Sequence, residues 1–442
     1  MKTLVWITVV PAVLAAGGCV IGAKYTVGGT LTGLTGQGLV LEDNSGNDLG
    51  LASNGTFVFS EGIKNGEAYS VTVKTQPSTP SQTCTVQNGS GSIDKGDITN
   101  VIVSCTQVGH FAYVANQLSN DLSAYAIDST TGALSAVSGS PFAANGTTPA
   151  ALAVDPDGTF LYVANNGSNN VSIYSIDSTS GALAVAGIVV SAGSGPIALT
   201  VDPTGSYLYV ANLASNNVSA YAIDSGAGTL TEVSGSPFAV GAGPSSLKIS
   251  PNGNYLYVTD FADRNVTVLA IDAATGSLSE IAGSPFGAGA GAQSIAIDPT
   301  GGYAYVANET AATISLYSIN TSTGALAALS GSPLASGTSP ESLVVDPAGR
   351  YVYAANVTAK NQVAVYSITP SSGALALSGA PIAAGTFPIS LALDPSGQFA
   401  YVANDNSNDI SVYAVNSLTG VLTATAHSPF AAGNAPRSIA ID

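Results

Sequence analysis

A short tyrosine-centred segment recurs seven times in this chain at an almost constant spacing. It first occurs as Tyr113-Val114-Ala115-Asn116, and the equivalent tyrosines are Tyr162, Tyr209, Tyr257, Tyr305, Tyr353 and Tyr401. The steps between them are 49, 47, 48, 48, 48 and 48 residues. A fixed period of this length indicates a repeat architecture, in which each unit is one supersecondary structure that buries its faces against its neighbours.

Each repeat contains four stretches with the composition of β-strands. In the first repeat they are His110–Asn116, Asp121–Asp128, Ala133–Val137 and Ala150–Asp155, separated by turns rich in Gly, Asn, Ser and Pro. Apolar, aromatic and β-branched residues between such turns are typical of strands. Four strands in about 48 residues are one blade of a β-propeller, and the small residues of Ala150–Asp155 suit the crowded innermost position.

The phase of the repeat predicts how the ring closes. The chain enters the first blade at its second strand, His110–Asn116, and the sequence ends directly after an innermost strand, Arg437–Asp442. The last strand therefore completes the first blade, a one-plus-three closure that leaves no open sheet edge at the junction. We predict an all-β chain, with a seven-bladed β-propeller of four-stranded blades over residues 108–442 and a small β-sandwich before it.

Several motifs resemble those of a known family. They are YVAN, with the variant Tyr257-Val258-Thr259-Asp260, an IDxxTG turn, an SPF loop and the segment PxxLAVDPxG. With them the chain resembles the YVTN-repeat and lactonase-like (6-phosphogluconolactonase-type) seven-bladed propellers over about residues 108–442. The resemblance implies the fold more strongly than the function, since one fold hosts many activities.

The first residues have the features of an export leader. Lys2 precedes an apolar run from Leu4 to Ala16, and Ala16-Gly17-Gly18-Cys19 resembles a bacterial lipobox. The run is too short for a mature membrane span. We predict a signal peptide over 1–18, lipidation of Cys19 and a tether over 19–23. Because Val20 follows the cysteine, family analogy places the anchor in the outer membrane. The alternative is an ordinary cleaved signal with an incidental Cys19.

Residues 24–107 do not follow the 48-residue period. Alternating runs at 39–41, 56–59, 69–74, 83–87 and 98–105 predict a small antiparallel β-sandwich. Two of the three cysteines, Cys84 and Cys105, are expected to pair, because an exported domain of this size is marginal on core burial alone. A redox or metal role for the pair has no CxxC motif or histidine cluster to support it.

Composition excludes several classes of function. The net charge is −17 with only ten Lys and Arg, so nucleic-acid binding is not expected. The single tryptophan lies in the leader, which argues against a quinone-cofactor propeller, and no metal or cofactor motif is present. The loop Asn404–Asp409 is dense in oxygen ligands, but it lacks the spacing of a calcium loop. We expect it to be a solvated turn, and we predict no metal and no cofactor.

Candidate functional residues are those that break the repeat at the mouth of the central channel. The asparagines that end the YVAN segments recur and are interpreted as structural, whereas Asp260 replaces one of them. At the heads of the innermost strands, Gln293, Glu341 and Arg437 interrupt an otherwise small or apolar set (Ala150, Ile197, Ser245 and Ile389). These four residues, Asp260, Gln293, Glu341 and Arg437, are the ligand-binding candidates. Glu341 and Arg437 are the weak catalytic candidates.

The resemblance also implies a histidine after the proline that opens an innermost strand, and this chain lacks it. Its two histidines are His110, expected at a variable surface turn, and His427, in a loop. The leading prediction is therefore a non-catalytic, lipid-anchored binding module of the cell envelope, monomeric, with a protein, glycan or small molecule as partner. The alternative is a lactonase-like hydrolase of a sugar lactone at the channel mouth, and a structural or adhesive envelope role is a third.

Overall fold

The computed structural model of the chain describes residues 23–34, 37–77, 82–107, 110–337, 339–357 and 361–442. It divides into two compact units, Met1–Val108 and Gly109–Asp442, and each is described here by itself. The predicted leader and Cys19, the predicted lipidation site, lie outside the described residues. Within the described part, no helix is long and apolar enough to cross a membrane.

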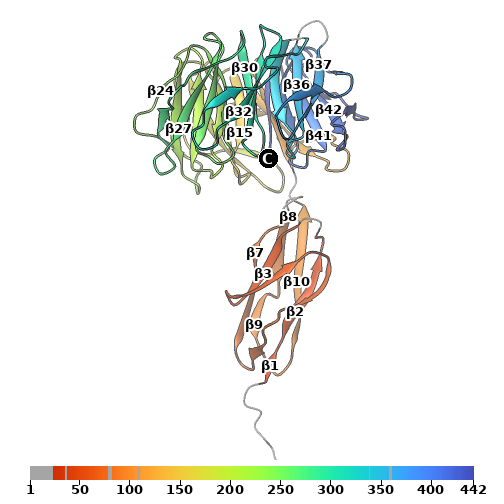
Figure 1. Cartoon of the computed structure of the whole chain (residues 1–442). Coiled ribbons are helices and arrows are strands. Elements are labelled where there is room, and N and C mark those ends of the chain that lie inside the picture. Colours follow the sequence, from red (N-terminus) through yellow and green to blue (C-terminus); the bar gives the residue numbers. More distant parts are fainter. Residues whose placement is uncertain (1–22, 35–36, 78–81, 108–109, 338, 358–360) are drawn as a thin grey trace, which may run out of the picture. The chain divides into compact units, whose positions relative to one another are not determined.

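Seven antiparallel sheets form the second unit (Figure 1). Their innermost strands are β15 (Pro149–Val154), β20 (Pro196–Val201), β25 (Pro244–Ile249), β30 (Ala292–Ile297), β35 (Ser339–Val345), β40 (Pro388–Leu393) and β45 (Pro436–Ile441). The second strands are β11 (Phe111–Asn116), β16 (Phe160–Asn165), β21 (Tyr207–Asn212), β26 (Tyr255–Asp260), β31 (Tyr303–Asn308), β36 (Tyr351–Val357) and β41 (Phe399–Asn404).

The outer half of each sheet has a long third strand and two short pieces beyond it. The third strands are β12 (Asp121–Ile127), β17 (Asn170–Ile176), β22 (Asn217–Ile223), β27 (Asn265–Ile271), β32 (Thr313–Ile319), β37 (Gln362–Ile368) and β42 (Asp409–Val415). The first short pieces are β13 (Leu134–Ala136), β18 (Leu183–Val185), β23 (Leu230–Glu232), β28 (Leu278–Glu280), β33 (Leu326–Ala328), β38 (Leu375–Leu377) and β43 (Leu422–Ala424). The second short pieces are β14 (Phe142–Ala143), β19 (Val190–Ser191), β24 (Phe238–Ala239), β29 (Phe286–Gly287), β34 (Leu334–Ala335), β39 (Ile382–Ala383) and β44 (Phe430–Ala431).

The predicted closure of the ring is confirmed. Strand β45 pairs antiparallel with β11, so the last strand of the chain completes the first sheet. Each innermost strand also contacts the innermost strands of the blades on either side, and β45 contacts β15 to complete the circle. The seven innermost strands thus surround the central channel.

The second strands are largely apolar before their closing Asn or Asp residues, because both faces of every blade are covered. All six residues of β16, Phe160–Asn165, are buried, and β11 and β41 show the same pattern. A continuous short apolar run is the sequence signature of a strand buried on both faces. Separate hydrophobic clusters fill the spaces between adjacent blades, and Leu152 of β15, for example, packs with Tyr113 of β11.

The IDxxTG turn locks each blade to its neighbour. The Oδ1 atom of Asp128 accepts backbone N–H groups from Thr130 and Thr131, each at 2.9 Å. Gly132 follows with φ of +70°, and a Cβ atom there would lie 2.3 Å from the Phe399 ring. Glycine is therefore required at this position for two reasons: the backbone is left-handed, and the aromatic ring approaches too closely for a Cβ atom.

The outer edge of each blade differs from the prediction in one detail. Phe142 and Ala143 were expected in a loop, but as β14 they pair with the same third strand, β12, that β13 already pairs with. Strand β12 is long enough to accommodate both short pieces, one after the other along its length. The outermost strand is therefore split in two.

The first unit is a two-layered sandwich. One sheet has the order β5 (Gly55–Val58), β2 (Val27–Thr32), β10 (Ile98–Gln107), β8 (Gln82–Gln87). The other has the order β4 (Asn47–Leu51), β3 (Leu39–Asp43), β7 (Ala68–Thr75), β9 (Ser90–Ser92). The strands β1 (Lys24–Tyr25) and β6 (Ile63–Lys64) form a separate pair. The prediction of an entirely antiparallel sandwich is wrong, because β2 and β10 are parallel.

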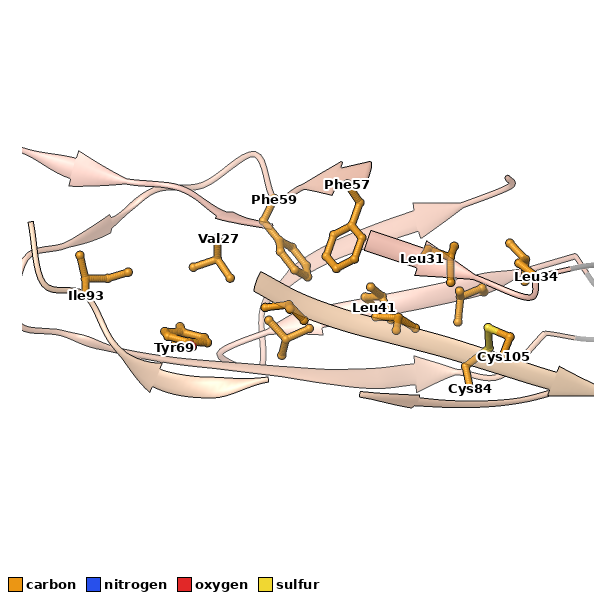
Figure 2. Packing of buried hydrophobic residues seen from close by; sticks show 14 residues of the cluster. Val27, Leu31, Leu34, Leu41, Phe57, Phe59, Tyr69, Cys84, Ile93 and Cys105 are labelled. Atoms are coloured by element: carbon orange, nitrogen blue, oxygen red, sulfur yellow. A yellow bond between two sulfur atoms is a disulfide. The ribbon is translucent and has the colours of Figure 1, made fainter. Parts of the chain in front are cut away.

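The core of the sandwich gathers apolar residues from both sheets (Figure 2). Phe57 and Phe59 meet edge to face with ring centroids 6.0 Å apart, and Leu41 and Tyr69 are buried with them. The disulfide between Cys84 and Cys105 joins β8 to β10 at the border of this cluster. It closes a loop with a sequence separation of 21 residues, which in the chain-entropy model adds roughly 3 kcal/mol of stability.

Candidate functional site

The asparagines that end the second strands bond within their own blades. Asn165 donates from Nδ2 to Oδ1 of Asn170 at 2.9 Å and to Oγ of Ser172 at 2.7 Å. A Cβ atom on Gly146 would lie 2.3 Å from Cγ of Asn165, so the loop before the innermost strand packs directly on the amide. Most of the other asparagines repeat these bonds. The set (Asn116, Asn165, Asn212, Asn308, Asn356 and Asn404) is fully buried and has a structural role.

Asp260 takes the place of this asparagine in the fourth blade. Its side chain is 0% exposed, and Oδ2 accepts hydrogen bonds from the Thr267 hydroxyl at 2.7 Å and the Thr267 N–H at 3.2 Å. Burial raises the pKa of the carboxyl group to about 7, against the opposing effect of the bonds from Thr267. The structure does not bring Asp260 to the other candidates, because its side chain turns back into its own hairpin.

The heads of the innermost strands do bring three candidates together. Gln293 of β30, Glu341 of β35 and Arg437 of β45 each follow the first proline or alanine of their strand, so all three lie at the same end of the channel. Glu341 is 9% exposed, whereas Gln293 and Arg437 are half-buried. They form the polar part of the channel mouth.

Glu341 is the most perturbed acid of this group. Burial is the main cause that raises its pKa, and the nearby Glu309 adds to it. Arg437 and a hydrogen bond from the Gln293 side chain act in the opposite direction. The resulting pKa is about 7. A carboxyl group that titrates near neutral pH at the mouth of a channel is suited to take up and release a proton.

The positive charge of Arg437 influences the pKa values of two carboxyl groups without a contact ion pair. It lowers the pKa of both Glu341 and Asp405, in each case against the effect of burial. Among the described residues, none of the ion pairs within 4.0 Å involves Arg437. Its guanidinium group is therefore not neutralised by a contact ion pair, and its donors remain open to an anionic or developing negative group.

Glu309 and Asp405 were not among the predicted site residues. Each directly follows the structural asparagine of its blade, Asn308 or Asn404. The seven residues at this position vary in kind, which was the available signal: Gln117, Asn166, Leu213, Phe261, Glu309, Val357 and Asp405. Together with the strand heads they make the mouth asymmetric. The charged and amide groups lie on β30, β35 and β45 or directly after β31 and β41. The opposite blades supply Ala150, Ile197, Leu213 and Phe261.

Both histidines lie away from the channel mouth. His110 is half-buried next to the closing strand, where Nδ1 lies 3.0 Å from the carbonyl oxygen of Asp442. Its predicted position at a variable surface turn is therefore wrong, because the residue takes part in ring closure. His427 is exposed between β43 and β44, at the outer edge of a blade. Neither is placed for proton transfer at the Glu341 group.

Within the described residues, no three His, Cys, Asp or Glu side chains are grouped so that they could hold a metal ion. The carboxyl groups of Glu309, Glu341 and Asp405 share a mouth without forming such a cluster. The channel mouth contains the Glu341 carboxyl group with a pKa of about 7, the Gln293 amide and the Arg437 guanidinium group, which has no contact ion pair.

Solved structures with the same architecture support the fold assignment. A proposed 6-phosphogluconolactonase from Bacteroides uniformis aligns with a TM-score of 0.68 at 20% identity, covering 76% of this chain and 100% of that chain. The periplasmic gluconolactonase of Pseudomonas aeruginosa aligns with a TM-score of 0.66 at 22% identity, covering 75% and 98%. A protein from Lactobacillus plantarum gives 0.65 at 21% identity, covering 76% and 100%.

Sequence comparison identifies the family. No curated protein matches the sequence. The family model described as "Lactonase, 7-bladed beta-propeller" matches residues 103–247 and 240–437, which is more than half of the chain. The chain therefore belongs to the lactonase family of seven-bladed β-propellers.

Proposed function

We propose that the protein hydrolyses small lactones at the channel mouth, with Glu341 as the general base. The observation that carries the proposal is the buried Glu341 carboxyl group with a pKa of about 7, next to the half-buried and unpaired Arg437. Catalytic acids and bases work best when their pKa lies near the operating pH. The family match supports ester chemistry of this kind.

Lactone hydrolysis requires two proton transfers, and Glu341 performs both. Glu341 accepts a proton from water as the water oxygen attacks the lactone carbonyl carbon. The ring C–O bond then breaks, and the protonated Glu341 returns the proton to the leaving alkoxide, which gives a hydroxy acid. Arg437 stabilises the negative charge that develops on the carbonyl oxygen. The Gln293 side chain, which lowers the pKa of Glu341, orients the carboxyl group.

Sugar lactones are the first substrate class to test. The Pseudomonas aeruginosa structure is described as a gluconolactonase, and the polar half of this mouth suits a ligand with several hydroxyl groups. The neutral half, with Leu213 and Phe261, suits the less polar face of such a ring. Residues that recognise individual hydroxyl groups are expected near Gln293, Glu309 and Asp405.

The test is hydrolysis of a panel of aldonolactones by the purified protein, with the background rate without enzyme subtracted. Glu341→Gln removes the base while keeping the shape, and it is expected to lower kcat by about 10²–10⁴-fold. Asp260→Asn is the matched control, because it removes a second carboxyl group with a pKa of about 7 that lies inside a blade. No turnover of any lactone by the wild-type protein would reject the proposal.

A non-catalytic binding module at the same mouth is the second candidate. It is favoured by the positions of His110 and His427, both away from the channel mouth. In that case aldonolactones or the corresponding acids bind without turnover, and Arg437→Ala weakens binding. Calorimetry on the panel used for the activity assay separates the two functions.

We further propose that the protein is exported as a monomer and anchored to the outer membrane through a lipid on Cys19. Support comes from the sequence of the leader alone. The test is metabolic labelling with a fatty-acid probe in a bacterial host, comparing the wild-type protein with Cys19→Ser. Equal labelling of both proteins would reject the anchor.

A further inference from the structure

One lysine stands in the innermost ring of the propeller. Lys248 belongs to β25, where it pairs with Tyr257, and its neighbours Leu247 and Ile249 are buried. In the other blades the equivalent residues are small or apolar: Ala153, Thr200, Ala296, Val344, Ala392 and Ala440. Lys248 is the only lysine in the described part of the propeller.

The surroundings of β25 place the Lys248 side chain in the central channel. One edge of β25 pairs with β26, and its faces contact β20 and β30 of the adjacent blades. The remaining edge borders the channel. Because Lys248 is nevertheless exposed, the solvent that it meets is the water of the channel.

The Lys248 ammonium group has no counterion. Neither a hydrogen bond nor an ion pair within 4.0 Å links it to another described residue. The surrounding channel wall removes part of the water around it, and this desolvation lowers the pKa of Lys248 with no carboxylate to oppose the effect. Lys74 shows the opposite arrangement, since Asp48 and Glu42 bind it and raise its pKa. A cation with incomplete solvation attracts a negatively charged partner.

Serine hydroxyls line the channel next to this cation. Four innermost strands carry a serine whose Oγ accepts the backbone N–H of the next innermost strand at 3.2–3.3 Å: Ser294, Ser342, Ser390 and Ser438. We call these four residues the serine ring. They are half-buried on strands whose faces are covered, so they too meet the channel. Each oxygen is already used as an acceptor, and no described residue accepts the hydroxyl hydrogens.

The serine ring and Lys248 lie at neighbouring levels of the channel. Ser294 stands two residues before Ala296, the β30 equivalent of Lys248. Two residues along a strand correspond to about 7 Å, a distance that the flexible four-carbon stem of lysine can bridge. The lining at this depth is therefore rich in donors, and its charge is positive.

We propose that the central channel binds a small oxyanion, a carboxylate or a phosphate, between Lys248 and the serine ring. Lys248 supplies the charge, and hydroxyl hydrogens of the ring donate to the remaining oxygen atoms. Hydrogen bonds of an oxyanion to a cation and to several donors are the strong class of polar contact in a desolvated site. The proposal goes beyond lactone hydrolysis and does not depend on it.

The charged residues at the mouth of the channel form the main alternative binding site for an anion. Arg437 is the cation there, and Glu341, Glu309 and Asp405 are the acids around it. An anion held at the mouth would depend on Arg437, whereas an anion held deeper depends on Lys248. Variants of the two cations therefore report where the anion binds.

The experiment is calorimetric titration of the protein with sodium phosphate and, separately, with sodium acetate, neither of which is an aldonic acid, in about 0.15 M salt to screen surface charges. Lys248→Ala places in β25 the residue that four other blades already have, so the fold is expected to persist. Ser294→Ala tests the ring in the same way, because Ala151 and Ala198 stand there in two blades. Arg437→Ala and Lys74→Ala are the controls for the mouth and for an unrelated cation.

The expected result is millimolar or tighter binding of at least one of the two anions, weakened roughly ten-fold or more by Lys248→Ala and less by Ser294→Ala. The two controls are expected to keep the wild-type affinity. Absence of binding of both anions up to about 10 mM would overturn the proposal. So would unchanged affinity in Lys248→Ala, or a loss confined to Arg437→Ala, which would place the anion at the mouth.

Discussion

The hydroxyl group of Tyr401 donates a 3.2 Å hydrogen bond to the carbonyl oxygen of Gly132, a residue 269 positions earlier in the chain. This bond joins the seventh blade to the first. The same contact joins five other pairs of adjacent blades: Tyr113 to Gly181, Tyr162 to Gly228, Tyr209 to Gly276, Tyr257 to Gly324 and Tyr305 to Gly373. The repeated tyrosine and the repeated glycine are therefore two halves of one inter-blade link.

Removing one of these hydroxyl groups is expected to destabilise the propeller. Tyr305→Phe deletes a buried 3.0 Å bond to Gly373 and leaves the carbonyl group without its donor, at a cost of about 1–2 kcal/mol. Tyr353→Phe is the matched control, because the buried Tyr353 hydroxyl has no partner among the described residues. Its loss is expected to be neutral or stabilising. Urea unfolding of the two variants checks the difference, and equal losses would contradict the link.

Asp260 is expected to make stability depend on pH. Its folded-state pKa of about 7 lies above the ordinary value of 3.8, so the folded state favours the neutral acid. Stability is therefore highest below the unfolded pKa and falls as pH rises to about 7. Asp260→Asn removes this penalty, and each pKa unit is worth ~1.4 kcal/mol, so the gain at about pH 8 is expected to reach up to about 4 kcal/mol.

The measurement is the free energy of unfolding of Asp260→Asn and the wild-type protein between about pH 4 and pH 8, where the gain should shrink as the pH falls. Asn308→Asp is the reciprocal control. It introduces a carboxyl group at the equivalent buried position and is expected to lower stability at the upper end of this range. A gain from Asp260→Asn that is the same at every pH would show that the carboxyl group does not titrate as described.

His110 is also expected to make stability fall as the pH rises. Its hydrogen bond with Asp442 raises its pKa above the ordinary value of 6.5. The protonated form therefore stabilises the junction between β11 and β45. This contribution is fully present below the unfolded pKa and is lost as pH rises through the folded value. His110→Gln, which introduces the residue found at the equivalent Gln398, should lose more stability near about pH 5.5 than near pH 8.

Much of the fold could be predicted from the sequence because its determinants are local and repeated. Tyr113 and its six equivalents set the period, and the position of Arg437–Asp442 at the end set the closure. The parallel pairing of β2 with β10 could not be predicted, because an alternating strand shows which face is buried and not which direction its neighbour runs. The splitting of the outer strand at Phe142 was missed for a related reason, since two residues carry no periodicity.

The site was only partly predictable. Gln293, Glu341 and Arg437 were found because they interrupt a repeated small or apolar position, and the structure brings them to one end of the channel. Asp260 also interrupts a repeat, but its side chain follows the hydrogen bonds of the asparagine that it replaces. The same reasoning, applied to the residue after each asparagine, would have found Glu309 and Asp405. A repeat-breaking residue thus indicates a difference between blades, and its surroundings decide whether that difference is functional.

The electrostatic setting of Glu341 gives a signature that a structural role would not produce. Glu309 raises the pKa of Glu341 and Arg437 lowers it. Glu309→Gln is therefore expected to move the midpoint of the pH–rate profile to lower pH, and Arg437→Ala to higher pH. The Arg437 variant should also lose about 10- to 100-fold in kcat/KM, the equivalent of one charge-assisted hydrogen bond. Shifts of both midpoints in one direction would contradict this arrangement.

The most direct test of the account is the pH dependence of kcat/KM for an aldonolactone, measured on the wild-type protein. Because Glu341 must be deprotonated to act as a base, kcat/KM is expected to rise with pH and level off above a midpoint of about 7. Asp260→Asn should leave that midpoint in place, and Glu341→Gln should abolish the ionisation together with most of the rate. Activity that persists in Glu341→Gln, or a midpoint that disappears in Asp260→Asn, would show that the channel-mouth carboxyl is not the base.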